Sequence, residues 1–362
     1  MRPEVWFGRA PGRVNLIGEH VDYLGGVVLP AAIDRHTLVA GRPAPEWSLA
    51  SEVEGGLVYA RAAGVELGSS PQAMRAVSGV PPGMGVSSSA ALLVAVAAGL
   101  NPGLDGKTAA LACQRAERRA TGVQVGVMDQ FASALGRREH ALLLDCGTLD
   151  YRYVPFPPDL VIAVIDSGVR RQLSETPYNQ RKQEAEQGMP KRRRHVESEI
   201  ARVHEFVDAL DRGDRPRLGE LVRASHVSLR DDFEVSTPAV DEIVERAWRV
   251  SGCLGARIMG AGFGGSVLAL LERGAEARFR EALSGSPILF CVTADGAFAG
   301  GGCSPFGPLP CPSPTEGGGN PPLPDPPPRS RGPREIRGSR GVGGGRERNA
   351  LWVHDAEAGT VR

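Results

Sequence analysis

Apolar positions divide the chain into short runs of strand length and longer stretches of helical spacing. Apolar runs bounded by glycine, proline or polar residues predict strands, whereas apolar residues three or four positions apart predict helices. The predicted strands cover residues 5–7, 14–17, 27–29, 33–40, 140–145, 160–166 and 288–293, with another after the glycines of residues 260–265. The predicted helices cover residues 90–98, 108–120, 130–135, 201–210, 217–226 and 272–283. Residues 42–70 are too weakly patterned to predict an element.

The pattern ends at about residue 297. From there to residue 348 the chain is dominated by glycine, proline and arginine, with almost no apolar periodicity. Such a segment cannot bury enough apolar surface to offset its ordering entropy, so residues 298–362 are predicted to be a disordered extension. We favour a non-native extension, such as a shifted reading frame, over an arginine/glycine-rich RNA-binding tail, because Trp352 is too isolated to stack bases.

Charge and length set limits on the partners of the chain. The chain has 362 residues, with 42 Lys and Arg balanced by 42 Asp and Glu, so no global charge favours nucleic acid or an anionic membrane. The basic run at residues 191–194 is followed by Glu197 and Glu199, and it predicts the solvated start of a helix. No apolar stretch reaches the ~18 residues needed to span a bilayer.

The cysteines and the first ten residues indicate where in the cell the protein is located. The chain has six scattered cysteines without a C-x-x-C pair, which is typical of thiols in a reducing compartment. The first ten residues lack the apolar core of a signal peptide. We therefore expect a cytoplasmic protein.

A glycine- and serine-rich loop precedes the helix predicted at residues 90–98. It reads P-G-M-G-V-S-S-S-A-A, with glycines at Gly83 and Gly85 and serines at Ser87, Ser88 and Ser89. A flexible turn at a helix N-terminus can bind phosphate through free N–H groups and the helix dipole. No Gly-Lys-Ser/Thr follows the glycines and the G-x-G-x-x-G spacing fails, so this is neither a Walker A nor a dinucleotide loop. The loop alone leaves a plain Gly/Ser linker equally open.

A second polar cluster lies between the strands predicted at residues 14–17 and 27–29. Glu19, His20 and Asp22 fall within four residues, and Arg13 precedes them. Carboxylates and an imidazole this close together can bind several hydroxyl groups of a sugar. The alternative is a solvated turn between two strands.

Three ordered motifs resemble a known family. The loop from Gly83 to Ala91 is similar to the ATP-binding loop of the GHMP kinases, and G-R-V-N-L-I-G-E-H-V-D-Y at residues 12–23 resembles the galactose-recognition signature of galactokinases. Residues 256–270, A-R-I-M-G-A-G-F-G-G-S-V-L-A-L, resemble the third GHMP motif. Two positions depart from the family pattern, namely Leu24 where Asn is usual and Met259 where Thr is usual.

The resemblance implies a role for each matching residue. Asp129, in G-V-M-D-Q-F, would face the anomeric hydroxyl of galactose, and Arg13 would lie beside it as a catalytic cation. Mg²⁺ would be held by Ser89 and Glu117. The residues implied in binding ATP are Gly83, Gly85, Ser87, Ser88, Ser89 and Ala90. The residues implied in binding the sugar are Glu19, His20, Asp22, Gly126 and Tyr178.

The resemblance also implies the fold and the reaction. The expected fold is α+β and two-lobed, with residues 1–158 as the N-terminal lobe, residues 159–297 as the C-terminal lobe, and the active site between them. The expected reaction converts ATP and galactose to galactose 1-phosphate and ADP, by a protein expected to be a monomer. The alternatives are a kinase for a related sugar, such as N-acetylgalactosamine or arabinose, and a sensor that binds ATP and galactose without turnover. Intact Ser89, Ala90 and Asp129 favour the enzyme.

Overall fold

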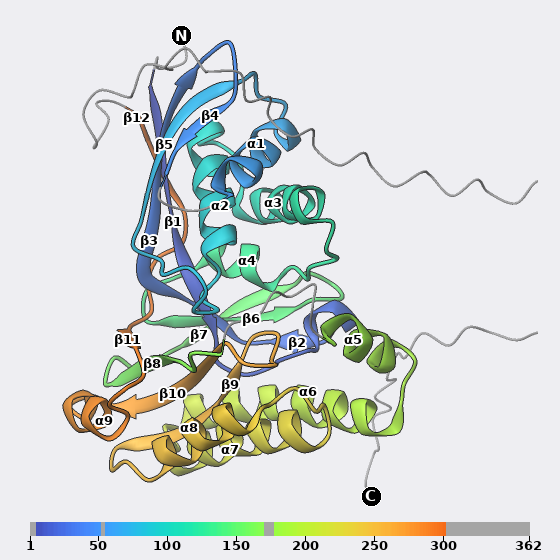
Figure 1. Ribbon diagram of the computed structural model, residues 1–362, viewed down its shortest axis with the longest axis vertical. Helices are drawn as coiled ribbons and strands as arrows, with labels where there is room; N and C mark the ends of the chain where they lie inside the picture. Colours follow the sequence, from blue (N-terminus) through green and yellow to red (C-terminus); the bar gives the residue numbers. More distant parts are fainter. Residues whose placement is uncertain (1–4, 52–54, 170–176, 302–362) are drawn as a thin grey trace, which may run out of the picture. The chain divides into compact units, whose positions relative to one another are not determined.

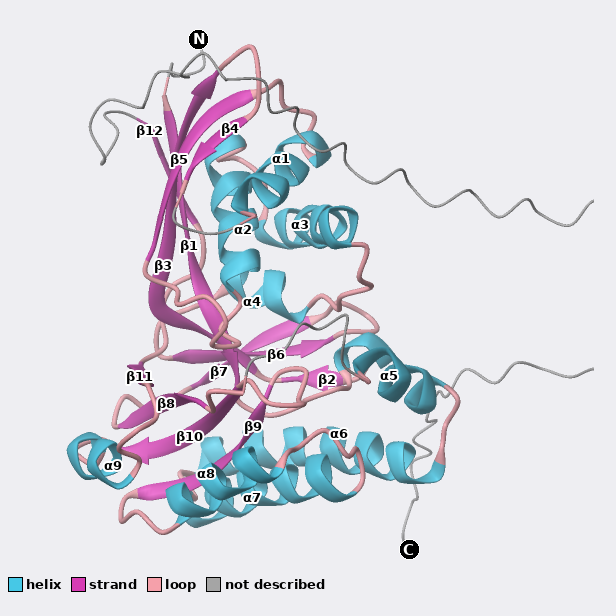
Figure 2. Ribbon diagram, in the orientation of Figure 1, coloured by secondary structure: helices cyan, strands magenta, loops and turns pink. Residues whose placement is uncertain are grey.

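The first half of the chain, together with the last described strand, forms a sheet covered by helices. The computed structural model describes residues 5–51, 55–169 and 177–301. Five strands pair in the order β12-β1-β3-β5-β4 (Figures 1 and 2), all antiparallel except β4 and β5. They are β1 (Trp6–Asn15), β3 (Pro30–Pro43), β4 (Ser48–Ala50), β5 (Gln72–Ser78) and β12 (Phe298–Gly301).

Four helices lie on one face of this sheet. They are α1 (Gly56–Glu66), α2 (Ser88–Leu100), α3 (Gly106–Thr121) and α4 (Met128–Leu135). Helix α2 is apolar all round after its two serines, and nine of its 13 residues are buried, which is expected of a helix at the centre of a core. It lies so close to β1 that a Cβ on Gly8 would be 2.0 Å from the carbonyl oxygen of Ala95. Small residues at this contact therefore set the spacing of helix and sheet.

The second half builds an antiparallel sheet in the order β11-β8-β10-β9. Its strands are β8 (Leu160–Asp166), β9 (Cys253–Met259), β10 (Ser266–Glu272) and β11 (Ile288–Cys291). The accompanying helices are α5 (Tyr178–Glu186), α6 (Pro190–Arg212), α7 (Arg215–Asp231), α8 (Pro238–Trp248) and α9 (Glu276–Ala282). A small sheet of β2 (Val27–Val28), β6 (His140–Asp145) and β7 (Tyr151–Pro155) completes the strands.

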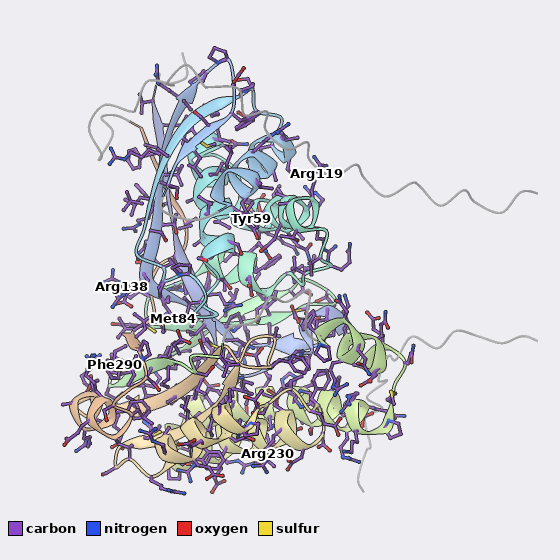
Figure 3. The ribbon with its side chains drawn as sticks, viewed as in Figure 1. Tyr59, Met84, Arg119, Arg138, Arg230 and Phe290 are labelled. Carbon is purple, nitrogen blue, oxygen red and sulfur yellow. The ribbon has the colours of Figure 1, made fainter. Side chains whose placement is uncertain are left out.

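One hydrophobic cluster connects the two larger sheets. It contains side chains from the end of β1, the loop before α2, β8, β10 and α6, including Val14, Leu16, Met84, Ile162, Leu268 and Phe206 (Met84 is labelled in Figure 3). The continuous apolar run of β8 is explained by burial on both faces. Ile162 and Val164 belong to this cluster, whereas Val161 and Ile165 belong to a second cluster on the other face. The shared cluster presses the segment after β1 and the loop before α2 against the second sheet.

The expected α+β class is confirmed, and several boundaries need correction. The separate strands expected at residues 5–7 and 14–17 both overlap one strand, β1, which runs from Trp6 to Asn15. The helix expected at residues 272–283 begins only at Glu276, because Glu272 still belongs to β10. Helices α5 and α8 were not predicted, nor were β4 and α1 in the weakly patterned region. Helix α1 is rich in alanine, so its buried face carries no strong apolar signal.

The expected start of the disordered extension was also wrong. Residues 298–301 form β12, which pairs with β1 and so returns the chain to the first sheet. The remainder of the extension, residues 302–362, lies outside the described residues. All described residues belong to the compact unit Met1–Pro324, and the division at residue 158 stays a prediction. Within the described ranges no helix has the length and apolar character needed to cross a membrane.

The basic run at residues 191–194 does begin a helix, α6, as predicted. It is not fully solvated, however. Arg192 is 6% exposed and forms ion pairs with Glu184 and Glu234. Acidic partners from two other segments therefore neutralise much of this run, because a buried guanidinium needs partners.

Candidate active site

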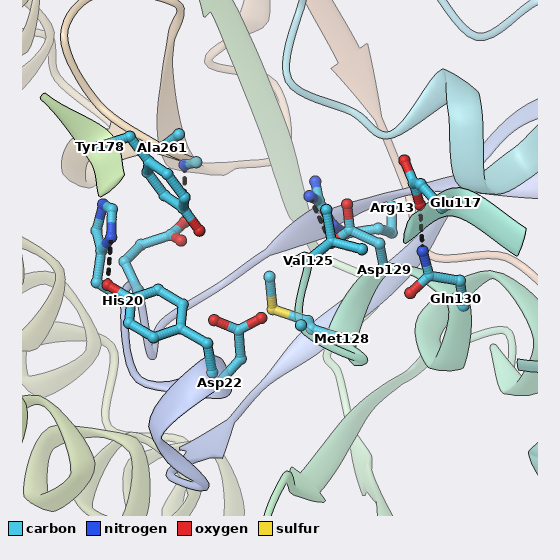
Figure 4. Close-up of a pocket in the computed structure, with 14 residues that line it drawn as sticks. Arg13, His20, Asp22, Glu117, Val125, Met128, Asp129, Gln130, Tyr178 and Ala261 are labelled. Atoms are coloured by element: carbon cyan, nitrogen blue, oxygen red, sulfur yellow. Dashed lines mark hydrogen bonds and ion pairs between the residues drawn. The ribbon is translucent and has the colours of Figure 1, made fainter. Parts of the chain in front are cut away.

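A single pocket gathers residues that are far apart in the sequence (Figure 4). It is lined by side chains from β1, the segment after β1, α3, α4, α5 and the turn after β9. The residues expected to act on or bind the sugar all line it, together with one of the two expected metal ligands. These residues are Arg13, Glu19, His20, Asp22, Glu117, Gly126, Asp129 and Tyr178.

Asp129 is held from two sides. It lies in the first turn of α4, and the Nε and Nη2 atoms of Arg13 each lie 2.7 Å from its Oδ1 atom. The Oγ atom of Ser87 donates a hydrogen bond of 2.5 Å to Oδ2. The side chain of Asp129 is 31% exposed, whereas that of Arg13 is 8% exposed. The carboxylate is therefore oriented by fixed partners and still open to the pocket.

Arg13 also connects this carboxylate to the serine loop. Its Nη1 atom donates a hydrogen bond of 2.6 Å to the carbonyl oxygen of Gly85, and its backbone N–H donates to Val86. From β10, the Oγ atom of Ser266 donates to the carbonyl oxygen of Met84 at 2.9 Å. The loop is thus tied by side chains from β1 and β10.

The backbone of the loop explains its glycines. Gly83 and Gly85 have φ values of 78° and 66°, in the left-handed region that favours glycine. Ser87 stands at the N-cap position of α2 with a φ of 58°, but its side chain does not cap the helix. The hydroxyl group of Ser87 instead donates to Asp129.

The predicted ATP-binding residues are not part of the pocket lining, although two of them reach its carboxylates. Ser88 begins α2, Ala90 is fully buried, and Gly83 and Gly85 form the turns before the helix. Met259, where the family usually has Thr, is buried behind this loop. Its Cε atom would lie 3.7 Å from a Cβ placed on Gly85.

Glu117 forms a second acidic position, next to Asp129. The Oγ atom of Ser89 donates a hydrogen bond of 2.7 Å to Oε1 of Glu117, and Nε2 of Gln130 donates to Oε2. Burial raises the pKa of Glu117 to about 7, and the negative charge of Asp129 contributes in the same direction. The Oε1 atom of Gln130 is buried without a hydrogen-bond partner in the described residues.

The oxygen atoms of Ser89 and Glu117 suit a hard cation that takes its other ligands from a substrate. The Ser89 hydroxyl and the Glu117 carboxylate present adjacent oxygen atoms, and a cation would relieve the cost of the buried carboxylate. Across the parts of the chain that the structure describes, no group of three His, Cys, Asp or Glu side chains could hold a metal ion. Mg²⁺ commonly binds through one or two protein oxygens plus substrate phosphates, and the oxygens of Ser89 and Glu117 match this ligand set.

The segment after β1 supplies the far side of the pocket. Gly18 has a φ of 100° and His20 a φ of 61°, so the backbone turns sharply on both sides of Glu19. Nδ1 of His20 lies 3.1 Å from the hydroxyl group of Tyr23. Tyr178, the first residue of α5, brings its ring to 5.8 Å from the His20 ring and 6.1 Å from the Tyr23 ring.

Asp22 and Gly126 meet across the pocket. A Cβ on Gly126 would lie 1.7 Å from Oδ2 of Asp22, so this position has no room for a side chain. Burial, together with the negative charges of Asp129 and Glu19, raises the pKa of Asp22 to about 6. The carboxylate of Asp22 is therefore harder to ionise than that of an exposed aspartate.

Sequence reasoning missed Gln130, Arg257 and Glu199. Gln130 lies within the G-V-M-D-Q-F motif and bonds Glu117, so its place in that motif was the available signal. Arg257 is fully buried and contacts Glu19, whereas Glu199 is fully buried and accepts hydrogen bonds from the backbone N–H groups of Gly18 and Glu19. A charged residue inside an apolar strand pattern indicates a buried partner, but the sequence does not say which partner.

Comparisons with known proteins agree with this geometry. A model of the galactokinase galactose-binding signature matches residues 2–43. Models of the N-terminal and C-terminal domains of GHMP kinases match residues 56–137 and 206–287. A galactokinase of Roseiflexus sp. is 38% identical over 339 residues, which cover 76% of this chain and 86% of that protein. A galactokinase of Thermococcus kodakarensis is 38% identical over 314 residues, covering 73% and 89% respectively.

Solved structures of galactokinase and mevalonate kinase also align with this chain. The crystal structure of Lactococcus lactis galactokinase complexed with galactose aligns with a TM-score of 0.75 and 28% identity, over 81% of this chain and 95% of that one. A mevalonate kinase structure aligns with a TM-score of 0.65 over 80% of this chain and 99% of that one, but at 17% identity it supports the fold alone. The resemblance seen in the three motifs thus extends over most of the folded chain, which belongs to the galactokinase family of the GHMP kinases.

Proposed function

We propose that the chain transfers the γ-phosphoryl group of ATP to the anomeric hydroxyl group of galactose, giving galactose 1-phosphate and ADP. The observation that carries this proposal is the position of Asp129. Its carboxylate is bonded by Ser87 of the serine loop and by Arg13, and it opens into the pocket that Glu19 and Asp22 line. A sugar hydroxyl in the pocket and a phosphate on the loop would therefore meet at this carboxylate.

Asp129 is the proposed acceptor of the hydroxyl proton. An oriented carboxylate can take that proton as the oxygen attacks the phosphorus atom, while the β–γ bridging bond breaks and ADP leaves with the electron pair. Arg13 is held within reach of both Asp129 and the serine loop, so its charge can also stabilise the transferring group. Phosphoryl transfer runs through a loose transition state, in which positioning and charge supply most of the catalysis.

Mg²⁺ is the proposed cofactor, with Ser89 and Glu117 as its protein ligands. When bound, the ion would neutralise charge on the phosphate groups of ATP. Gln130 holds the second oxygen of Glu117 and so orients the carboxylate. The proposed ATP contacts are Gly83, Gly85, Ser87, Ser88, Ser89 and Ala90, around the N-terminus of α2, where backbone N–H groups favour anions.

Galactose would be held by Glu19, His20, Asp22, Gly126 and Tyr178. Carboxylates accept hydrogen bonds from sugar hydroxyls, and the rings of His20 and Tyr178 wall one side of the pocket. Because Gly126 has no side chain, the carboxylate of Asp22 can pack directly against its backbone. We also propose that the protein is a monomer, that it acts in the cytoplasm, and that it binds neither nucleic acid nor a membrane.

The direct test is release of ADP from ATP and Mg²⁺ with galactose, N-acetylgalactosamine, arabinose and homoserine supplied separately. We expect turnover with galactose and rates lower by at least about tenfold with the others, because a changed or missing hydroxyl leaves buried polar groups unpaired. Equal or faster turnover with another acceptor would reassign the substrate. Galactose binding by calorimetry without turnover would favour the sensor.

For the catalytic carboxylate, we expect Asp129→Ala to lower kcat by about 10²–10⁴-fold, because the proton acceptor is gone. The Kd values of galactose and ATP should change far less, as measured by calorimetry. Asp159→Asn is the matched control, because Asp159 also pairs with an arginine, Arg215, but lies outside the pocket lining. Near-normal turnover by Asp129→Ala would remove this residue from the chemistry.

For the metal, Glu117→Gln is expected to raise the Mg²⁺ concentration at half-maximal activity by about tenfold or more. The substitution keeps the shape of the side chain and removes the charge that attracts the cation. A Mg²⁺ titration at saturating galactose and ATP measures the change, with Glu66→Gln, in an ion pair with Arg115, as the control. An unchanged titration curve argues against Glu117 as a ligand.

Galactose affinity should depend on the charge of Asp22. Because its pKa is raised to about 6, Asp22 loses its charge as the pH falls below 6 and becomes a weaker acceptor for sugar hydroxyls. We therefore expect the Kd of galactose, measured without ATP or Mg²⁺, to rise as the pH falls from 7.5 to 5. In Asp22→Asn the Kd should be high throughout and flatter. A constant wild-type Kd over this range would show that ionised Asp22 is not required.

A further inference from the structure

We propose that Arg257 and Glu199 are positioning residues for galactose binding, which hold Glu19 by its side chain and its backbone. This inference rests on the proposed function, because it assigns Glu19 to a sugar hydroxyl. Arg257 lies on β9 and Glu199 on α6, so both act from the second half of the chain on a segment of the first. Neither residue lines the pocket itself.

Arg257 holds the side chain of Glu19. Its Nη1 and Nη2 atoms each lie 3.2 Å from Oε1 of Glu19, and the backbone N–H of Gly260 donates to the same oxygen at 3.0 Å. Among the described residues, none donates to the second oxygen, Oε2, although Glu19 lines the pocket. Three donors thus hold Oε1, and Oε2 is the oxygen that we assign to a sugar hydroxyl.

Arg257 also holds the chain that leads to Glu19. Nε donates to the carbonyl oxygen of Leu16 at 3.1 Å, Nη1 to that of Ile258 at 2.8 Å, and Nη2 to that of Asn15. The guanidinium is fully buried and crosses from β9 to the end of β1. Its planar fork can serve several carbonyl groups and one carboxylate at once, which the single ammonium group of lysine cannot do.

Glu199 holds the backbone of the same residue. Its Oε1 atom accepts hydrogen bonds from the N–H groups of Gly18 at 3.0 Å and Glu19 at 3.2 Å, and from Ser225 Oγ at 2.7 Å. Nε2 of His195 lies 3.1 Å from the carbonyl oxygen of Glu19. Both polar groups of the Glu19 backbone are therefore bound by α6.

The charges in this region are arranged to keep Glu199 ionised. Burial alone would raise its pKa, but His195, Arg202 and Arg257 outweigh burial and lower the pKa to about 2. A buried ion pair is seldom the best way to stabilise a fold, because desolvation offsets most of the attraction. Two such charges directed at one pocket residue are better explained by the orientation that they impose on Glu19.

The test compares Arg257→Lys and Glu199→Leu with wild type. Both variants should raise the KM of galactose by about tenfold or more. The KM of ATP and kcat should stay within about threefold, because Arg13 and Asp129 are held by other contacts. Glu199→Gln retains an oxygen that can accept from Gly18 and Glu19, so it should restore the KM of galactose to within about threefold of wild type.

Arg215→Lys is the matched control, since Arg215 also pairs with a carboxylate, Asp159, away from the pocket lining. Thermal unfolding identifies variants that remain folded at the assay temperature. If Arg257→Lys does not fold, the comparison of Glu199→Leu with Glu199→Gln tests the positioning role. Folded variants with an unchanged KM of galactose, or with equal losses for galactose and ATP, would overturn the positioning roles alone. A wild type that neither binds nor phosphorylates galactose would instead overturn the proposed function.

Discussion

The structure of the site depends on the bonds of one guanidinium group. Arg13 lies near the end of the long strand β1, where it donates to Oδ1 of Asp129 and to the carbonyl oxygen of Gly85. Because the planar fork has fixed donor directions, it sets the position of α4 relative to the serine loop. Ser87 of the same loop donates a hydrogen bond to Oδ2 of Asp129. The proposed proton acceptor and the proposed phosphate loop are therefore positioned by the same residue.

The other half of the site is positioned from the second sheet. The cluster that includes Leu16, Met84 and Ile162 packs the segment after β1 and the loop before α2 against the second sheet. Arg257 and Glu199 then add directional bonds to Glu19, which apolar packing cannot supply. Packing brings the two halves together, and hydrogen bonds choose the orientation of the side chains in the pocket.

Electrostatic cost is concentrated where the ligands are proposed to bind. Asp22 and Glu117 have pKa values raised to about 6 and 7, since both are buried and both lie near Asp129. Glu199, in contrast, has balancing cations and a lowered pKa. Asp22 is assigned to galactose and Glu117 to Mg²⁺, whereas Glu19, also assigned to galactose, is already paired with Arg257. A sugar hydroxyl or a cation bound to these carboxylates would offset the cost of burying their charge, and perturbed pKa values of this kind cluster at functional sites.

The sequence by itself determined the family, the α+β class and most of the residues that line the pocket. Glycine turns, closely spaced polar residues and serines before a helix are local features, whose chemistry can be recognised within about ten positions. The sequence did not determine β12, helix α1 or the roles of Arg257, Glu199 and Gln130. Strand β12 exists because it pairs with β1. Buried charges acquire meaning only from partners such as Glu19, 238 positions from Arg257. Tertiary packing decided these features, because the free energy of a buried charge depends on neighbours that local sequence does not name.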